Sequence, residues 1–112
     1  MEFQRIYDWE DGIGLKGYLT TDYQRLVDTF GEPHNLDDVK SDAEWDMRFK
    51  DGEIAMIYNY RNGKNCRGEE GTPTESITVW NVGARRAAVV TRVARLLKLK
   101  RNGERHGFPH YG

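Results

Sequence analysis

A glycine-rich segment near the middle of the chain carries the residues with the most chemical potential. It reads Arg61-Asn62-Gly63-Lys64-Asn65-Cys66-Arg67-Gly68-Glu69-Glu70-Gly71-Thr72-Pro73. Its glycines let the backbone approach a ligand closely, and successive N–H groups in such turns can form an anion-binding nest. Its three cations add charge-assisted donors, so a phosphate or carboxylate suits the segment. The glycine spacing matches neither a Walker A loop nor a dinucleotide-binding fingerprint, and the alternative interpretation is a flexible connection of turn residues.

Aromatic side chains flank this segment. Tyr58 and Tyr60 precede it and Trp80 follows it, and an aromatic ring beside cations can stack a nucleobase while arginine holds its phosphate. The sequence therefore predicts a nucleotide-type site, in which Asn59 and Asn65 form hydrogen bonds with the edges of the base or the ribose. Its candidate ligand-binding residues are Asn59, Tyr60, Arg61, Lys64, Asn65, Arg67 and Trp80. Core packing is the preferred interpretation for Tyr58 and an open alternative for Tyr60 and Trp80.

Three acids at alternate positions precede this region. If the strand is regular from Asp42 onward, Asp42, Glu44 and Asp46 line one face. They could accept hydrogen bonds from a ligand's base or ribose, bind a hard metal ion, or pair with surface cations, and surface salt bridging is preferred. No His, Asp and Glu cluster has recognised ligand spacing, so neither a metal nor another cofactor is expected.

The sequence gives little support for catalysis. No serine, cysteine or threonine has a histidine partner implied by a known motif. Glu69 and Glu70 are an acid/base pair in principle, but adjacent carboxylates in a loop are usually solvated. Cys66 is the only cysteine, which excludes an intramolecular disulfide and fits a reducing compartment. We therefore expect a protein that is not an enzyme.

The length and composition predict one domain. A chain of 112 residues, 38% hydrophobic and 31% charged, is close to the commonest domain size. We expect a single α+β domain over residues 1–102 and a flexible tail over residues 103–112. No apolar run approaches a membrane span of about 20 residues, and the N-terminus lacks a secretory signal pattern, so a cytosolic protein without a membrane partner is expected.

Charge is distributed unevenly along the chain. Residues 1–60 hold 14 acidic and 6 basic side chains, whereas residues 61–112 hold 4 acidic and 11 basic ones. Such asymmetry can steer an anionic partner to one side of the molecule, or it can be neutralised internally. The acidic half would repel nucleic acid and no reading motif is present, so direct DNA or RNA binding is not expected.

The sequence predicts a β-hairpin at the centre of the fold. Apolar and charged residues alternate from Ala43 to Lys50, and Asp51-Gly52 suits a two-residue type I′ turn. This turn places Phe49 opposite Ile54, Met47 opposite Met56 and Trp45 opposite Tyr58, with all six side chains on one sheet face.

The remaining elements complete an α+β fold. A capping box of Thr21 and Gln24 begins a first helix that Gly31 and Pro33 end, and its buried face holds Tyr23, Leu26, Val27 and Phe30. Two strands precede it, Phe3–Tyr7 and Leu15–Leu19, around a turn at residues 11–14. A strand at Ser76–Val82 and a second, arginine-rich helix at Ala84–Leu99 follow the hairpin, with Val90, Val93, Ala94 and Leu97 as the buried stripe. The predicted order is β-β-α-β-β-β-α, an antiparallel sheet of about five strands with two helices on one face.

Several stretches of the chain resemble a group of small bacteriophage proteins of unassigned role. They are the residues 40–45 (KSDAEW), 49–52 (FKDG), 57–65 (IYNYRNGKN), 68–73 (GEEGTP) and 77–80 (ITVW), and the resemblance covers roughly residues 15–95. The chain departs from it at Cys66, where an aromatic is expected, and in the arginine-rich second helix. Phage accessory proteins of this kind resemble, as a class, stoichiometric inhibitors of host defence or of host enzymes, which implies the host cytoplasm and no catalytic residues.

These observations give three functional hypotheses. The first is a non-catalytic phage accessory protein that counters host defence by binding and sequestering a nucleotide-type immune signal. The second is an inhibitor, such as an anti-CRISPR, that occupies a host defence protein through the acidic strand face or the basic helix. The third is a nucleotide-processing enzyme. Homo-oligomer formation is compatible with each of them.

Overall fold

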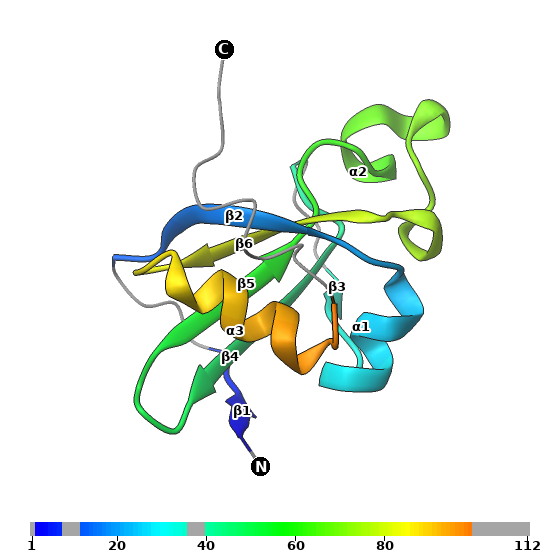
Figure 1. The fold of residues 1–112 in the computed structure, drawn as a ribbon. Helices are drawn as coiled ribbons and strands as arrows, with labels where there is room; N and C mark the ends of the chain where they lie inside the picture. The colour runs from blue at the N-terminus through cyan, green and yellow to red at the C-terminus, as the bar shows by residue number, and fades with distance from the viewer. Residues whose placement is uncertain (1, 8–11, 36–39, 100–112) are drawn as a thin grey trace.

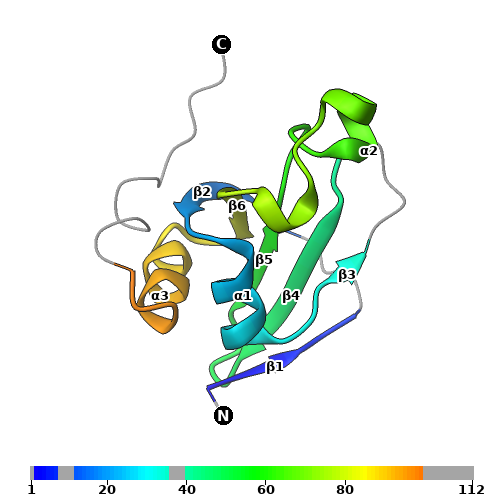
Figure 2. The ribbon, with the colours of Figure 1, turned by 90° about the vertical axis from the view of Figure 1, so that its right-hand side faces the viewer.

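A single antiparallel sheet organises the chain. The computed structural model describes residues 2–7, 12–35 and 40–99 (Figure 1). The strands are β1 (Phe3–Arg5), β2 (Gly14–Thr20), β3 (His34–Asn35), β4 (Ala43–Phe49), β5 (Ile54–Tyr58) and β6 (Val79–Ala84). Their order is β1-β4-β5-β6-β2, and β3 pairs with β4 beyond the end of β1. Helices α1 (Tyr23–Phe30) and α3 (Ala88–Leu96) lie on the same side of the sheet (Figure 2).

The α+β class and the antiparallel sheet with its helices on one face are confirmed. The described residues add one strand to the prediction, β3, and a short helix α2 (Lys64–Arg67) with two 3-10 turns (Gly68–Glu70 and Thr74–Ser76). The segment after β5 is therefore folded and is not a structureless loop. The predicted tail at 103–112 and the first residue of the predicted turn at 11–14 lie outside the described residues.

The core lies between the sheet and the two covering helices. Trp45 of β4 and Trp80 of β6 are 0% exposed, and their ring centroids are 5.3 Å apart at an interplanar angle of 79°. The indole N–H of Trp45 donates to the Gly31 carbonyl at the end of α1 (2.8 Å). The helices contribute Leu26, Phe30, Val90, Val93 and Ala94, and Leu97 follows the end of α3; all six are buried as predicted. Tyr23 and Val27, also predicted on the buried face of α1, are only partly buried and pack against the core.

The register of the β4–β5 hairpin differs from the prediction by one residue. Phe49 pairs with Glu53 across a three-residue loop, and Gly52 there has a φ of 92°, which favours glycine. This is the geometry of a type I turn followed by a glycine bulge, not of a two-residue turn. The predicted pairing of Trp45 with Tyr58 was wrong because a one-residue shift reverses the faces of β5.

As a result, β5 has a different inner face. Trp45 pairs with Ile57 and Met47 with Ala55, and these four residues are fully buried under the helices. Met56 and Tyr58 instead lie, half-buried, on the opposite face, which we call the open face. Ile54 is also on that side and is 2% exposed, so β5 is covered on both faces near the hairpin.

Helix α1 begins one residue later than predicted. Its N-cap is Asp22, whose carboxylate accepts a hydrogen bond from the Arg25 N–H (2.7 Å), so the assignment of Thr21 as N-cap was wrong. Gln24 does not complete a capping box; its amide donates to Asp28 (2.8 Å). The predicted end at Gly31 is confirmed.

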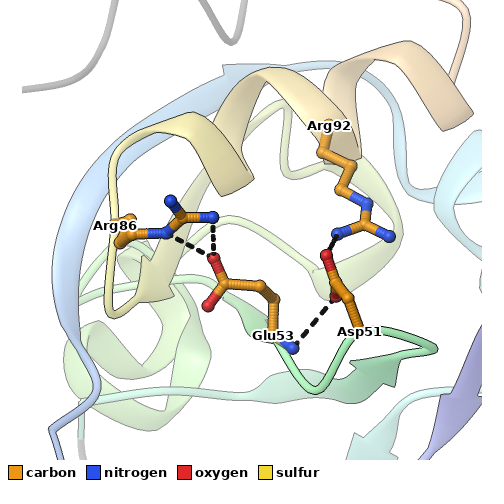
Figure 3. Close-up of polar contacts among 4 residues, drawn as sticks. All are labelled: Asp51, Glu53, Arg86 and Arg92. Carbon is orange, nitrogen blue, oxygen red and sulfur yellow. Dashed lines mark hydrogen bonds and ion pairs between the residues drawn. The ribbon is translucent and has the colours of Figure 1, made fainter.

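Helix α3 begins at Ala88, later than the predicted Ala84, because Ala84 is the last residue of β6. It lies over the tip of the hairpin, where Arg86 pairs with Glu53 and Arg92 pairs with Asp51 at 2.7 Å (Figure 3). Arg92 also stacks on the Phe49 ring, 4.0 Å from its centroid. These contacts join the basic second half of the chain to its acidic first half, so part of the charge asymmetry is neutralised internally.

The Arg92–Asp51 contact gives a test of this packing. The hydrogen bond from Arg92, and a second from the Glu53 N–H, hold the pKa of Asp51 below its ordinary value. We expect Arg92→Gln to raise the pKa of Asp51 toward that value, measured by NMR titration of the carboxyl carbon. Arg95→Gln, which removes an exposed arginine of the same helix, should leave it unchanged. An unaltered Asp51 pKa in Arg92→Gln would contradict the contact.

The same shift predicts the sign of a pH effect. A carboxyl whose pKa is lower in the folded than in the unfolded chain stabilises the fold above its unfolded pKa. The contribution is lost as the pH falls below about 4 toward the lowered pKa of Asp51. Arg92→Gln should therefore reduce stability more at neutral pH than in acid.

Candidate functional site

A hollow of about 250 Å³ on the open face of the sheet is the candidate site, and we call it the tyrosine hollow. Its lining residues are Ile13, Gly14, Leu15, Lys40, Ser41, Met56, Tyr58, Tyr60 and Gly83. They come from β2, β5, β6 and the segment that leads into β4, so chain regions far apart in sequence meet here. The lining combines aromatic and aliphatic side chains with one lysine, as ligand pockets commonly do.

The sheet register produces this hollow. Because β5 turns Met56 and Tyr58 to the open face, both side chains lie beside Gly83 of β6, which pairs with Met56. Gly83 has no side chain to fill the space between them. A Cβ at Gly83 would lie 3.3 Å from Ile13 and 3.6 Å from Tyr58, so the glycine allows these residues to close in around the floor.

Asn59 positions the rim. Its side-chain carbonyl accepts hydrogen bonds from the N–H groups of Asp42 (2.8 Å) and Ala43 (3.1 Å). The Arg61 N–H donates to the Lys40 carbonyl at 2.7 Å. These bonds tie the end of β5 to the start of β4, and they hold Tyr60 and Lys40 at the same hollow.

The glycine-rich segment does bind an anion, and that anion belongs to the chain itself. The buried carboxylate of Asp42 accepts hydrogen bonds from the Asn65 N–H (3.0 Å) at the start of α2 and from the Asn59 amide (2.9 Å). A Cβ at Gly63 would collide with this carboxylate, and a Cβ at Gly71 would collide with the Gly63 carbonyl. Glycine is required at these positions because the segment closes tightly on Asp42.

The three acids Asp42, Glu44 and Asp46 therefore do not line one face of a strand. Asp42 lies outside β4 and is buried in the glycine-rich segment, so surface salt bridging does not describe it. Glu44 and Asp46 are half-buried on the open face, where they pair with Tyr58 and Met56 respectively.

The structure brings together only part of the predicted ligand-binding set. Tyr60 lines the hollow and is 43% exposed, and the exposed Arg61 follows it at the rim. Lys64 and Arg67 are exposed on α2 and do not line the hollow; the Arg67 guanidinium donates to the Arg61 carbonyl (2.9 Å). Asn65 is engaged through its side-chain amide with the Ser41 carbonyl (2.9 Å).

Two further members of that set lie inside the protein. Trp80 is 0% exposed in the core, and its N–H donates to the Ile77 carbonyl (3.2 Å). Asn59 is likewise 0% exposed, and its polar atoms are used in hydrogen bonds within the chain. Neither side chain has a surface that a ligand can contact, so Asn59 is a positioning residue and Trp80 a core residue.

Of the nine described lining residues, the predicted set contains only Tyr60, and the missed residues that offer an aromatic ring or a charge are Tyr58 and Lys40. Tyr58 had been assigned to core packing from the incorrect register, and Lys40 precedes the strand in a stretch without periodicity. The spacing of Tyr58 and Tyr60 was the available signal, because residues two apart in an extended chain point the same way.

Two cations lie near Tyr60. Lys40 lines the hollow with it, and the guanidinium of the exposed Arg61 lies 5.4 Å from the Tyr60 ring centroid. Among residues 2–7, 12–35 and 40–99, no group of three or more His, Cys, Asp or Glu is arranged to hold a metal ion.

Comparisons with models of known protein families, with curated proteins and with solved structures find no match for this chain. In the part of the chain that the structure describes, no helix has the length and apolar character needed to cross a membrane.

Proposed function

We propose that the protein binds a nucleotide-type ligand in the tyrosine hollow and sequesters it without chemical change. The observation that carries this proposal is the meeting of Tyr58, Tyr60 and Lys40 in one open hollow with Arg61 at its rim. An aromatic ring stacks a nucleobase, and a lysine or arginine beside it balances the phosphate charge. A volume of about 250 Å³ suits one ring system, with the phosphate outside at the cationic rim.

The biological role that we propose follows from the resemblance to small phage proteins. A stoichiometric binder of a nucleotide immune signal would act in the host cytoplasm, and it needs affinity but no catalytic group. The hollow supplies stacking surfaces and cations, which are the groups that such binding requires.

The test is calorimetry of the full chain with a panel of nucleoside monophosphates and cyclic dinucleotides. Binding followed by recovery of the intact ligand on heating supports sequestration. Conversion of the ligand would favour a nucleotide-processing enzyme. Absence of heat with every nucleotide would contradict the proposal and favour a protein partner.

Matched variants locate the binding site. We expect Tyr60→Ala to weaken nucleotide affinity by roughly 5- to 150-fold, because base–aromatic stacking contributes about 1–3 kcal/mol. Lys40→Ala should also weaken nucleotide affinity, because Lys40 lines the same hollow. Lys64→Ala, which removes an exposed lysine that does not line the hollow, is the control and should leave affinity nearly unchanged. A larger loss in Lys64→Ala than in Lys40→Ala would instead place the ligand on α2.

The second candidate function, a protein-binding inhibitor, is favoured by one observation. Helix α2 and the 3-10 turn at Gly68–Glu70 project beyond the sheet (Figures 1 and 2), and they expose Lys64, Arg67, Glu69 and Glu70. A charged projection of this kind suits a protein contact. The basic helix gives less support, since Arg86 and Arg92 already pair with hairpin carboxylates.

A further inference from the structure

Arg61, at the rim of the tyrosine hollow, has a backbone conformation that its residue type disfavours. Its φ is 57°, in the left-handed region that residues with a Cβ rarely adopt. Arginine lacks the short polar side chain with which asparagine or aspartate compensates for this conformation through local hydrogen bonds. Residues kept in disfavoured conformations cluster at functional sites, so the presence of an arginine at this position needs an explanation.

Lys98 is a useful comparison, because its similar conformation has an ordinary cause. It is the other residue with a positive φ, glycines apart, in the part of the chain that the structure describes (58°). The Lys98 N–H donates to the Arg95 carbonyl (3.0 Å) and the Leu99 N–H to the Ala94 carbonyl (2.9 Å), which is the Schellman pattern that ends many helices. Arg61 ends no helix, so helix termination does not account for its conformation.

The conformation of Arg61 brings the two cations of the rim together. Its N–H donates to the Lys40 carbonyl (2.7 Å), and its own carbonyl accepts from the Arg67 guanidinium (2.9 Å). The Arg61 and Lys40 side chains therefore start from neighbouring backbone positions. Both side chains are exposed, Lys40 lines the hollow, and the Arg61 guanidinium lies 5.4 Å from the Tyr60 ring centroid. One group of a ligand at this rim can contact both cations.

Acidic side chains do not balance these cations within the hollow. None of the described lining residues is an aspartate or a glutamate. Among the described residues, no carboxylate forms an ion pair with the Arg61 guanidinium, whereas Arg86 and Arg92 of the hairpin contact both have one. A group with two negative charges is attracted to such a rim more strongly than a group with one, because each charge adds its own Coulomb energy.

We infer that the ligand carries a terminal phosphate, a phosphomonoester, which Arg61 and Lys40 bind at the rim of the tyrosine hollow. This inference rests on the proposed function. A phosphomonoester has a charge of about −1.5 to −2 at pH 7 and three acceptor oxygens, two of which match the parallel N–H donors of a guanidinium. A phosphodiester, as in cyclic nucleotides, has one negative charge and fewer free oxygens, so it gains less from the same two cations.

The test compares AMP, GMP, CMP and UMP, as 5′-monophosphates, with the 3′,5′-cyclic monophosphates of the same nucleosides. Each pair shares the base, the sugar and one phosphorus atom, and only the first member has a terminal phosphate. We expect the parent protein to bind the 5′-monophosphate at least about 10-fold more tightly in calorimetry, since a hydrogen bond to a charged group is a strong one. Arg61→Gln should reduce this preference to less than about threefold. Lys64→Gln removes an exposed cation that does not line the hollow, and it should keep the preference.

Arg61→Gly separates the role of the side chain from that of the backbone. Glycine adopts a φ of 57° readily, and relief of the left-handed conformation offsets the greater freedom of glycine in the unfolded chain. The urea concentration at half-unfolding should therefore be no lower than in the parent. Affinity for the 5′-monophosphate should nevertheless fall at least about 10-fold, because the guanidinium is absent. A lower urea midpoint would show that the arginine side chain supports the fold, and it would overturn the assignment of that side chain to a ligand.

The outcomes separate this inference from the proposed function. Equal affinity of the parent for the two kinds of phosphate, or an undiminished preference in Arg61→Gln, would overturn recognition of a terminal phosphate and leave nucleotide binding in place. Lack of binding by every nucleotide would overturn both. The comparison on the parent protein decides the question even if Arg61→Gln fails to fold, which circular dichroism would reveal.

Discussion

Trp45→Ala is expected to lower the free energy of unfolding by roughly 3–5 kcal/mol, as truncation of a buried tryptophan usually does. The side chain is 0% exposed and packs edge-on against Trp80. It also links the sheet to α1, because its N–H donates to the Gly31 carbonyl. The substitution therefore removes both a large apolar surface and a contact between layers. Urea denaturation followed by circular dichroism measures the change.

Two further variants divide this loss into its parts. Trp45→Phe keeps a ring in the core but removes the N–H donor to Gly31, so it should cost clearly less than Trp45→Ala. Val79→Ala, on β6 of the same sheet but 45% exposed, should change stability by less than about 1 kcal/mol. If Trp45→Ala unfolded at the same urea concentration as the parent, the assignment of Trp45 to the core would fail.

The hairpin shows what a sequence pattern can and cannot determine. Strict alternation over β4 predicted its buried face correctly, since Trp45, Met47 and Phe49 are all buried. The sequence of β5, Ile54 to Tyr58, is continuously apolar and gives no alternation from which to choose a face. The length of the turn therefore determines which face of β5 is buried. The sequence does not determine this length, because glycine at positive φ suits a three-residue loop as well as a two-residue one.

The candidate site depended on that same choice. With the observed register, Tyr58 and Met56 reach the open face and form the tyrosine hollow; with the predicted register they would have been core residues. Tyr60 was predicted because it is an aromatic residue directly beside the cations of the glycine-rich segment in the sequence. Lys40 was missed because its position depends on hydrogen bonds between segments about 17 residues apart, those from the N–H groups of Asp42 and Ala43 to Asn59.

The glycine-rich segment combines a correct chemical prediction with an unexpected partner. Its geometry does favour an anion, but Asp42 occupies it from a position 23 residues before Asn65. Local spacing cannot reveal a partner that distant in sequence. The same cluster of Asp42 and Asn59 holds the segment on one side and the rim of the tyrosine hollow on the other, so folding of the segment and ligand binding should be coupled.

Asp42→Ala tests this coupling, and we expect it to lower the free energy of unfolding by roughly 2–5 kcal/mol. The substitution removes the acceptor of the Asn59 amide and of the Asn65 N–H, and each buried donor left without a partner costs about 1–3 kcal/mol. Asp42→Asn keeps one acceptor oxygen with nearly the same shape, and it should lose about half as much. Urea denaturation gives both values.

The loss of stability in Asp42→Ala should be concentrated in the glycine-rich segment. A local loss of this kind distinguishes a residue that organises one segment from an ordinary core residue. Amide hydrogen exchange should accelerate first over residues 61–72, where the Thr72 N–H donates to Asn62 and the Arg67 N–H to Gly63, while β4 and β6 keep their protection. Nucleotide affinity should fall in the same variant, since Lys40 and Tyr60 would no longer be held together. Uniform acceleration across the sheet, or unchanged exchange in the segment, would show that Asp42 does not organise it.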